Sequence, residues 1–80
     1  MIRLRENAPS QEIDLKGVPC PLNWAKAKVR LEALPSRELL VLFVDDSRAV
    51  RDIPRAAEAE GYDVLEVDPI PTGWRILIQK

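Results

Sequence analysis

The sequence predicts an α+β fold, a two-layer α/β sandwich in which two helices pack on one face of a mixed four-stranded sheet. Three observations lead to this prediction. Apolar residues recur at strand spacing in some segments and at helical spacing in others. Proline and glycine separate these segments into the order βαβαββ. The chain has 80 residues, enough for one small hydrophobic core, so we expect a single domain over residues 1–80.

The first predicted strand and helix flank the one cysteine of the chain. Residues 11–17 (QEIDLKG) alternate apolar and polar side chains, which is typical of a half-buried strand, and Gly17 and Pro19 end it. Residues 21–34 then follow helical spacing up to Pro35, where a helix does not readily continue. The stretch GVPCPLN is therefore a connection between a strand and a helix.

This helix has two apolar rows, and one of them can face the core. The first row contains Trp24, Ala27, Leu31 and Leu34, and the second contains Leu22, Ala25, Val29 and Ala33. Because the Trp24 row is bulkier, we expect it to face the core. Leu22, Ala25 and Val29 would then lie near the surface, at the end of the helix next to Cys20.

A second strand and helix follow. Residues 38–44 (ELLVLFV) form an unbroken apolar run that predicts a central strand. The next three residues, DDS, are good N-cap residues, so we expect a helix from about Arg48 to Gly61. Pro54 inside this helix predicts a kink or a restart.

The chain ends in a predicted hairpin. Two short strands, residues 62–67 (YDVLEV) and 74–79 (WRILIQ), are joined by DPIPTG, whose prolines and glycine indicate a hairpin loop. The hairpin strands should be antiparallel, whereas each strand-helix-strand unit needs a right-handed crossover and predicts parallel neighbours.

The central strand is apolar on both of its faces, although the predicted helices cover only one face of the sheet. An exposed apolar sheet face would be a docking surface for a partner. Alternatively, long neighbouring side chains cover it, or the N-terminal segment does, through residues such as Ile2 and Leu4.

Composition excludes several kinds of chemistry. With one cysteine and no histidine, the chain has no internal disulfide, no cysteine-based zinc site and no histidine base, and we expect neither a metal nor a cofactor. The net charge of −1 argues against direct binding of nucleic acid. No apolar run reaches the roughly 20 residues that span a bilayer, and the first residues lack the apolar core of a signal peptide. We therefore expect a protein of the reducing cytoplasm, away from membranes.

Cys20 is placed to be a reactive thiol. It is expected at the N-cap of the first helix, with Pro21 at the first helical position, where a missing N–H costs nothing. The free N–H groups of the first turn and the helix dipole favour an anion there, so the thiolate is plausible at neutral pH. Lys16, Lys26 and Lys28 would add positive potential, unless they form only a solvated face.

The alternative for Cys20 is a buried cysteine that acts as a small apolar residue. Its position in Pro-Cys-Pro, between a strand end and a helix start, favours reactivity instead. The chain offers no histidine base for hydrolysis and no second thiol for disulfide exchange. What remains is a sulfur that accepts a group, holds it and passes it to a second protein.

The sequence resembles the TusA/SirA-like sulfur carriers over nearly all of the chain after Ser10. The resemblance lies in DLKGVPCPLN, DD at residues 45–46, RDIP at 51–54, EGYDVLEV and the closing WRILIQK, in the order of that family. It implies a two-layer α/β sandwich. It also implies that Cys20 receives persulfide sulfur from a pyridoxal-phosphate-dependent cysteine desulfurase.

By the same resemblance, the sulfur passes to a downstream acceptor protein, in some members toward thiolation of the wobble uridine of tRNA. Such a protein is a sulfurtransferase-type carrier rather than a self-sufficient enzyme. The resemblance assigns the helix-starting proline to Pro21. It implies that four further residues have structural or partner-facing roles: Gly17, Asp46, Arg51 and Pro54.

The sequence departs from the family motif at Asn23. The motif is usually Cys-Pro-x-Pro, and Asn23 replaces its second proline. Two roles are open for its amide: it reaches back to the backbone N–H of Cys20, as in a capping box, or it approaches the sulfur directly. The change could mark a branch with another donor, acceptor or cargo, such as selenium.

Two other functions compete with sulfur transport. In one, the chain is a regulatory or interaction module in which the open sheet face and the surface from Leu22 to Val29 bind a partner and the cysteine is incidental. In the other it binds RNA directly, although it lacks the GxxG loop and the aromatic strand residues of such modules.

Overall fold

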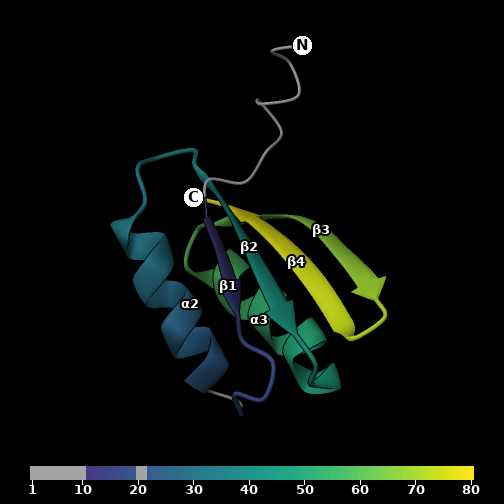
Figure 1. Ribbon diagram of the computed structural model, residues 1–80. Helices are drawn as coiled ribbons and strands as arrows, with labels where there is room; N and C mark the ends of the chain where they lie inside the picture. Colours follow the sequence, from purple (N-terminus) through teal and green to yellow (C-terminus); the bar gives the residue numbers. More distant parts are fainter. Residues whose placement is uncertain (1–10, 20–21) are drawn as a thin grey trace.

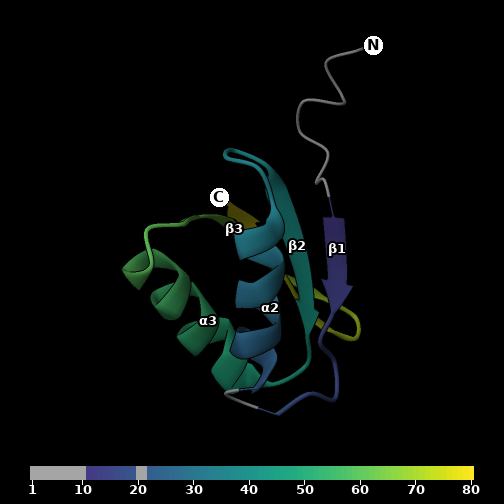
Figure 2. The ribbon, with the colours of Figure 1, turned by 90° about the vertical axis from the view of Figure 1, so that its left-hand side faces the viewer.

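The fold has the predicted order of elements. The computed structural model describes residues 11–19 and 22–80, so the predictions for Ile2, Leu4, Cys20 and Pro21 lie outside the described residues. The elements are β1 (Gln11–Asp14), α2 (Leu22–Ala33), β2 (Leu39–Val44), α3 (Ser47–Ala59), β3 (Asp63–Ile70) and β4 (Gly73–Gln79) (Figure 1). Both helices pack on the same face of one four-stranded sheet, as a two-layer α+β sandwich (Figure 2).

The order of strands in the sheet is β1-β2-β4-β3. β1 pairs with β2 in parallel, as predicted. The prediction that β2 and β3 are parallel neighbours is wrong, because β4 lies between them and is antiparallel to both. The reason is burial: β4 contributes Ile76, Leu77 and Ile78 to the interior, whereas most side chains of β3 are exposed at the sheet edge.

The hairpin is tighter than predicted. Only two residues, Pro71 and Thr72, separate β3 from β4, because the strands extend into the segment expected to be a loop. Pro69 lies within β3 opposite Trp74. An edge strand tolerates a proline, since its N–H can be missing on the side away from the partner strand.

The main core lies between the helices and the sheet. Its fully buried members include Leu15, Ala27, Leu31, Leu40, Leu42, Ile53, Ile76 and Ile78. The predicted orientation of α2 is confirmed: Trp24 packs against this core, while Leu22 and Val29 are 49% and 65% exposed.

The open face of the sheet is less exposed than its sequence indicates. Leu39, Val41 and Leu77 form a second buried cluster there, with Phe43 packed against it. Arg75, on the same face, forms ion pairs with carboxylates of β3. Charged groups therefore lie at the edge of this cluster. Because these apolar side chains are buried, the structure favours the alternative in which neighbouring side chains cover the open sheet face, rather than the one in which that face is an exposed docking surface.

The second helix begins and ends as predicted. Asp46 is its N-cap, and Gly61, with a φ of +94°, follows its end. Pro54 lies inside a single continuous helix, so the predicted restart is not found.

Candidate functional site

The loop that leads to Cys20 is built on the end of β1. The N–H of Leu15 donates to the carbonyl of Phe43 over 2.7 Å, and the Leu15 side chain is buried. The N–H of Val18 then donates to the carbonyl of Leu15 and closes a turn. Gly17 occupies the third position of this turn with a φ of +82°, a conformation that favours glycine.

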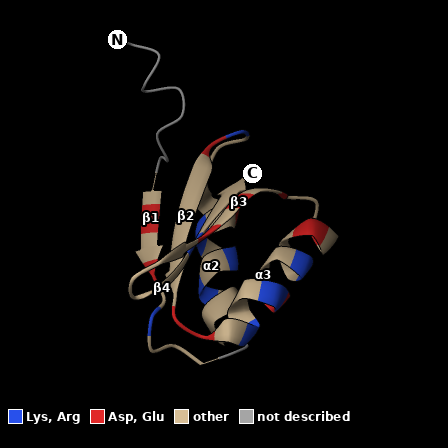
Figure 3. Cartoon of the chain, turned by 90° about the vertical axis from the view of Figure 1, so that its right-hand side faces the viewer, with Lys and Arg blue, Asp and Glu red and all other residues tan. Residues whose placement is uncertain are grey.

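A second contact fixes this loop from the other side. The N–H of Gly17 donates to Oδ1 of Asp45 over 3.1 Å. Asp45 belongs to the acidic segment between β2 and α3 (Figure 3), and the next residue, Asp46, accepts the N–H of Arg48 at 2.8 Å. The two aspartates thus have different tasks: Asp45 holds the loop before Cys20, and Asp46 caps α3.

Asp45 is a residue that sequence reasoning missed as part of the site. A signal for it existed, because β1 and β2 are parallel and the carboxyl ends of parallel neighbours meet at the same edge of a sheet. A side chain directly after β2 is therefore close to the loop directly after β1.

On the far side of Cys20, the chain enters α2 through a hydrogen bond between backbone groups. The N–H of Asn23 donates to the carbonyl of Pro19 over 3.1 Å. The Asn23 side chain is buried, with 1% of its surface exposed, and its Oδ1 accepts the N–H of Trp24 at 2.7 Å. Its amide nitrogen Nδ2 has no hydrogen-bond partner among the described residues.

Within the described residues, Asn23 Oδ1 accepts the N–H of Trp24. The amide therefore stabilises the first turn of α2 through one of its free N–H groups. Both roles predicted for this amide involve Cys20, so they lie outside the described residues.

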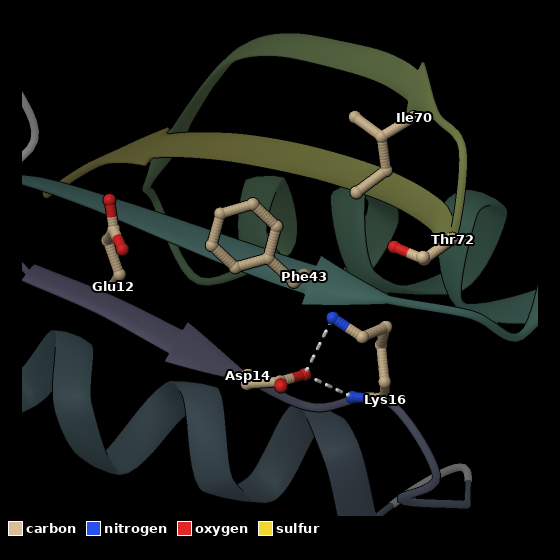
Figure 4. A pocket seen from close by; sticks show the side chains of 6 residues that line it. All are labelled: Glu12, Asp14, Lys16, Phe43, Ile70 and Thr72. Atoms are coloured by element: carbon tan, nitrogen blue, oxygen red, sulfur yellow. Dashed lines mark hydrogen bonds and ion pairs between the residues drawn. The ribbon is translucent and has the colours of Figure 1, made fainter.

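The three lysines expected near the site differ in their surroundings. Lys16 forms an ion pair with Asp14 at 3.4 Å, and its Nζ lies 5.6 Å from the centre of the Phe43 ring, on the open face of the sheet (Figure 4). Lys28 forms an ion pair with Glu60 at 3.3 Å. Lys26 has no ion pair with any residue in the described ranges, so it is the lysine whose charge is least neutralised.

Lys16 also acts on Asp14 through its backbone. The Lys16 N–H donates to Asp14 Oδ1 over 3.0 Å and, together with the nearby ammonium group, lowers the pKa of Asp14.

A shallow pocket of about 480 Å³ lies on the open face beside Lys16. Its lining residues are Glu12, Asp14, Lys16, Phe43, Ile70 and Thr72 (Figure 4). Within residues 11–19 and 22–80, no three His, Cys, Asp or Glu residues come together as metal ligands.

The remaining predicted residues lie on α3. Arg51 is exposed and forms an ion pair with its neighbour Asp52 at 3.4 Å, and Pro54 is half-buried. In the described part of the chain, no hydrogen bond or ion pair joins either residue to the loop of residues 15–19. The structure thus brings Gly17 and the Asp45-Asp46 segment together, and it leaves Arg51 and Pro54 outside that contact.

Comparison with known proteins assigns the fold and the site loop to a family. The family model described as Sulfurtransferase TusA matches residues 11–80, which include the site loop and all six elements. The chain belongs to the TusA family. The match begins at the first residue of β1.

Curated relatives of this TusA-family chain match nearly all of its length. It is 38% identical over 87 aligned positions to an Archaeoglobus fulgidus protein provisionally named a sulfur carrier, with 100% of this chain and 99% of that protein covered. It is 32% identical over 80 positions to YedF of Escherichia coli K12, also provisionally named a sulfur carrier, with 96% and 100% covered.

A solved structure agrees with the TusA-family fold. The SirA-like protein of Desulfitobacterium hafniense superposes with a TM-score of 0.76 and 25% identity, over 86% of this chain and 95% of that one. Neither α2 nor α3 has the length and apolar content to cross a bilayer.

Proposed function

We propose that this protein is a sulfur carrier that holds sulfur as a persulfide on Cys20. A cysteine desulfurase would be the donor, and a second protein with a reactive thiol would be the acceptor. The observation that carries the proposal is the support on both sides of the single cysteine: the Gly17 to Asp45 contact before it and the start of α2 after it. The names of the two curated relatives support the same role.

The transfer balances without an added oxidant or reductant. The Cys20 thiolate attacks the outer sulfur of the donor's persulfide, so a new S–S bond forms while the donor's S–S bond breaks and its cysteine leaves as a thiolate. In the second step an acceptor thiolate attacks the outer sulfur on Cys20. Cys20 then leaves as a thiolate, ready for another cycle.

The exposed side of α2 offers a surface for the donor or the acceptor. Leu22 and Val29 are exposed apolar residues, and Lys26, Val29 and Arg30 line a shallow groove beside Ile13. Such a surface fits a partner that presents an apolar contact with acidic residues around it. Any route of the sulfur to tRNA would then pass through the acceptor protein.

Mass spectrometry of the intact protein tests the proposal. After incubation with cysteine and a cysteine desulfurase, the wild-type protein should gain the mass of one sulfur atom, and a thiol reductant should remove it. Cys20→Ser should gain none. If the wild type gains no more sulfur than Cys20→Ser, the protein is not a persulfide carrier.

The exposure of Leu22 and Val29 also supports a second candidate, an interaction module in which the cysteine is incidental. Complementation of a strain that lacks the gene distinguishes the two functions. If the protein is an interaction module, the Cys20→Ser variant should restore the phenotype and the Val29→Glu variant should not. If the protein is a sulfur carrier, the Cys20→Ser variant should fail to restore it.

A further inference from the structure

The strand β1 forms one edge of the sheet. The order of strands is β1-β2-β4-β3, so within the described residues β1 pairs with β2 alone. The strand at the other edge, β3, contains Pro69 and a change of register between Val64 and Glu66, two features that discourage pairing with a further strand. β1 has neither a proline nor such an irregularity. It is therefore the edge of the sheet that is better suited to pair with another strand.

The backbone of β1 presents hydrogen-bonding groups along this edge. In an edge strand, alternate residues direct their N–H and C=O groups to the neighbouring strand, and the residues between them direct theirs outward. The N–H of Leu15 donates to the carbonyl of Phe43, at the end of the pairing with β2. By this alternation Ile13 also faces β2, whereas the backbone groups of Glu12 and Asp14 face outward. In the described part of the chain, no backbone group outside the sheet pairs with either residue.

The two faces of the sheet differ in charge beside this edge. On the open face, the side chains of Glu12 and Asp14 are exposed (Figure 4). On the helix side, Ile13 and three residues of α2 line a shallow groove of about 260 Å³: Lys26, Val29 and Arg30. Figure 1 shows α2 alongside β1, at the side of the sheet away from β2. A strand added to β1 would therefore have carboxylates next to it on one face and this groove on the other.

These surroundings specify the side chains of such a strand. Successive side chains of a strand point to opposite faces of the sheet. Those next to Glu12 and Asp14 would be basic, since opposite charges on neighbouring strands attract and like charges repel each other. Those on the other face would be apolar, because they would contact Ile13 and Val29 in the groove. The edge thus fits a segment in which basic and apolar residues alternate.

We propose that the outer edge of β1 binds an extended segment of a partner protein, with alternating basic and apolar side chains, as a further strand of the sheet. This inference deepens the proposed function, and it rests on that function for the role of the partner as sulfur donor or acceptor. The loop of residues 15–19 begins where β1 ends. Pairing with β1 would therefore hold the partner beside the loop that leads to Cys20.

Nuclear magnetic resonance of the full chain with a short synthetic peptide provides the first test. The peptide has blocked ends and alternates arginine with valine. On its addition, the backbone amide signals of Glu12 and Asp14 should shift and their hydrogen exchange should slow. A peptide that alternates glutamate with valine should bind about tenfold more weakly or less. If neither amide responds, if the amides of β3 respond instead, or if the two peptides bind equally, the inference is overturned.

Two variants of Glu12 distinguish strand pairing from charge attraction. Glu12→Pro removes an outward N–H and keeps the bonds between Ile13 and β2, a change that an edge strand tolerates. It should weaken binding of the arginine-valine peptide about tenfold or more. Glu12→Gln keeps the N–H and removes the charge alone, so its effect should be smaller and should shrink in high salt. Equal binding by the wild type and Glu12→Pro, with the fold checked by circular dichroism, contradicts the proposal.

A modified peptide tests strand pairing without any variant of the protein. An arginine-valine peptide with methylated backbone nitrogens has the same side chains but cannot donate to β1, so it should not bind the wild type. Binding that methylation leaves unchanged would rule out strand pairing. Cys20→Ser should bind the unmodified peptide as the wild type does. Failure of the wild type to gain sulfur from a desulfurase would refute the proposed function and leave these peptide measurements interpretable.

Discussion

The backbone N–H of Gly17 donates a hydrogen bond to Oδ1 of Asp45 over 3.1 Å, between residues 28 positions apart in the chain. This contact joins the loop before Cys20 to the segment that starts α3. The loop is thus held at three points: the end of β1, the Asp45 carboxylate and the first turn of α2. Its position depends on the tertiary structure more than on its own sequence.

Asp45→Ala should weaken the sulfur-transfer function while leaving most of the stability. The substitution removes an exposed hydrogen bond to a charged acceptor, which we expect to cost about 1 kcal/mol in the free energy of unfolding. The rate of sulfur transfer to Cys20 should fall several-fold, because the loop loses one of its supports. Asp45→Asn keeps an oxygen acceptor and is the control. Equal transfer rates for wild type and Asp45→Ala would mean that the contact does not position the loop.

Val29→Glu should impair the encounter with a partner without affecting the fold. Val29 is 65% exposed on α2, so a carboxylate there costs little in the isolated protein. It would, however, repel an acidic partner surface and disrupt the apolar contact. Sulfur transfer from the desulfurase should slow about tenfold or more, mainly through a higher KM. Val67→Glu, at an exposed apolar residue on the edge strand β3, should leave transfer unchanged.

Gly73→Ala should be among the most destabilising single substitutions in the chain. Gly73 has a φ of +148°, and a Cβ there would lie 2.9 Å from Cα of Asp45 and in collision with the carbonyl of Val44. Because these are backbone atoms, relief requires β2 and β4 to separate. We expect a loss of more than about 2 kcal/mol in denaturant unfolding.

Gly61→Ala is the matched control for Gly73→Ala. Gly61 also has a positive φ, +94°, but no atom lies within 4 Å of an added Cβ. Its substitution should therefore cost only the conformational strain, about 1 kcal/mol. Equal losses for the two variants would rule out the steric explanation.

Asp14 should titrate below the usual range of an aspartate. The backbone N–H of Lys16 is the main cause of its lowered pKa. Because the folded-state pKa is lower than the unfolded one, the contribution of Asp14 to stability is present above about pH 3.9 and is lost as the pH falls through the folded value. Carboxyl chemical shifts measure this pKa. Lys16→Gln keeps the backbone donor, so the Asp14 pKa should stay below its usual range in that variant; a return to the usual value would assign the shift to the ammonium instead.

Periodicity and punctuation predicted much of the fold. The six elements, their order and the core row of α2 follow from local patterns of apolar residues and from proline and glycine. The position of β4 between β2 and β3 did not follow, because pairing depends on which strand gains most by burial on both faces. The length of the hairpin was missed for a related reason: an edge strand tolerates Pro69, which looked like a loop residue.

The candidate site also has some features that the sequence predicted and others that only the tertiary structure revealed. The sequence by itself determined that the chain has one cysteine thiol and no histidine base, and it predicted a helix shortly after the thiol. Only the tertiary structure decided that Asp45, rather than Asp46, holds the preceding loop, and that the buried Asn23 amide has a donor without a partner among the described residues. Residue types and their local spacing fix what chemistry is available, whereas burial and contacts between distant residues fix which polar groups are left to carry it out.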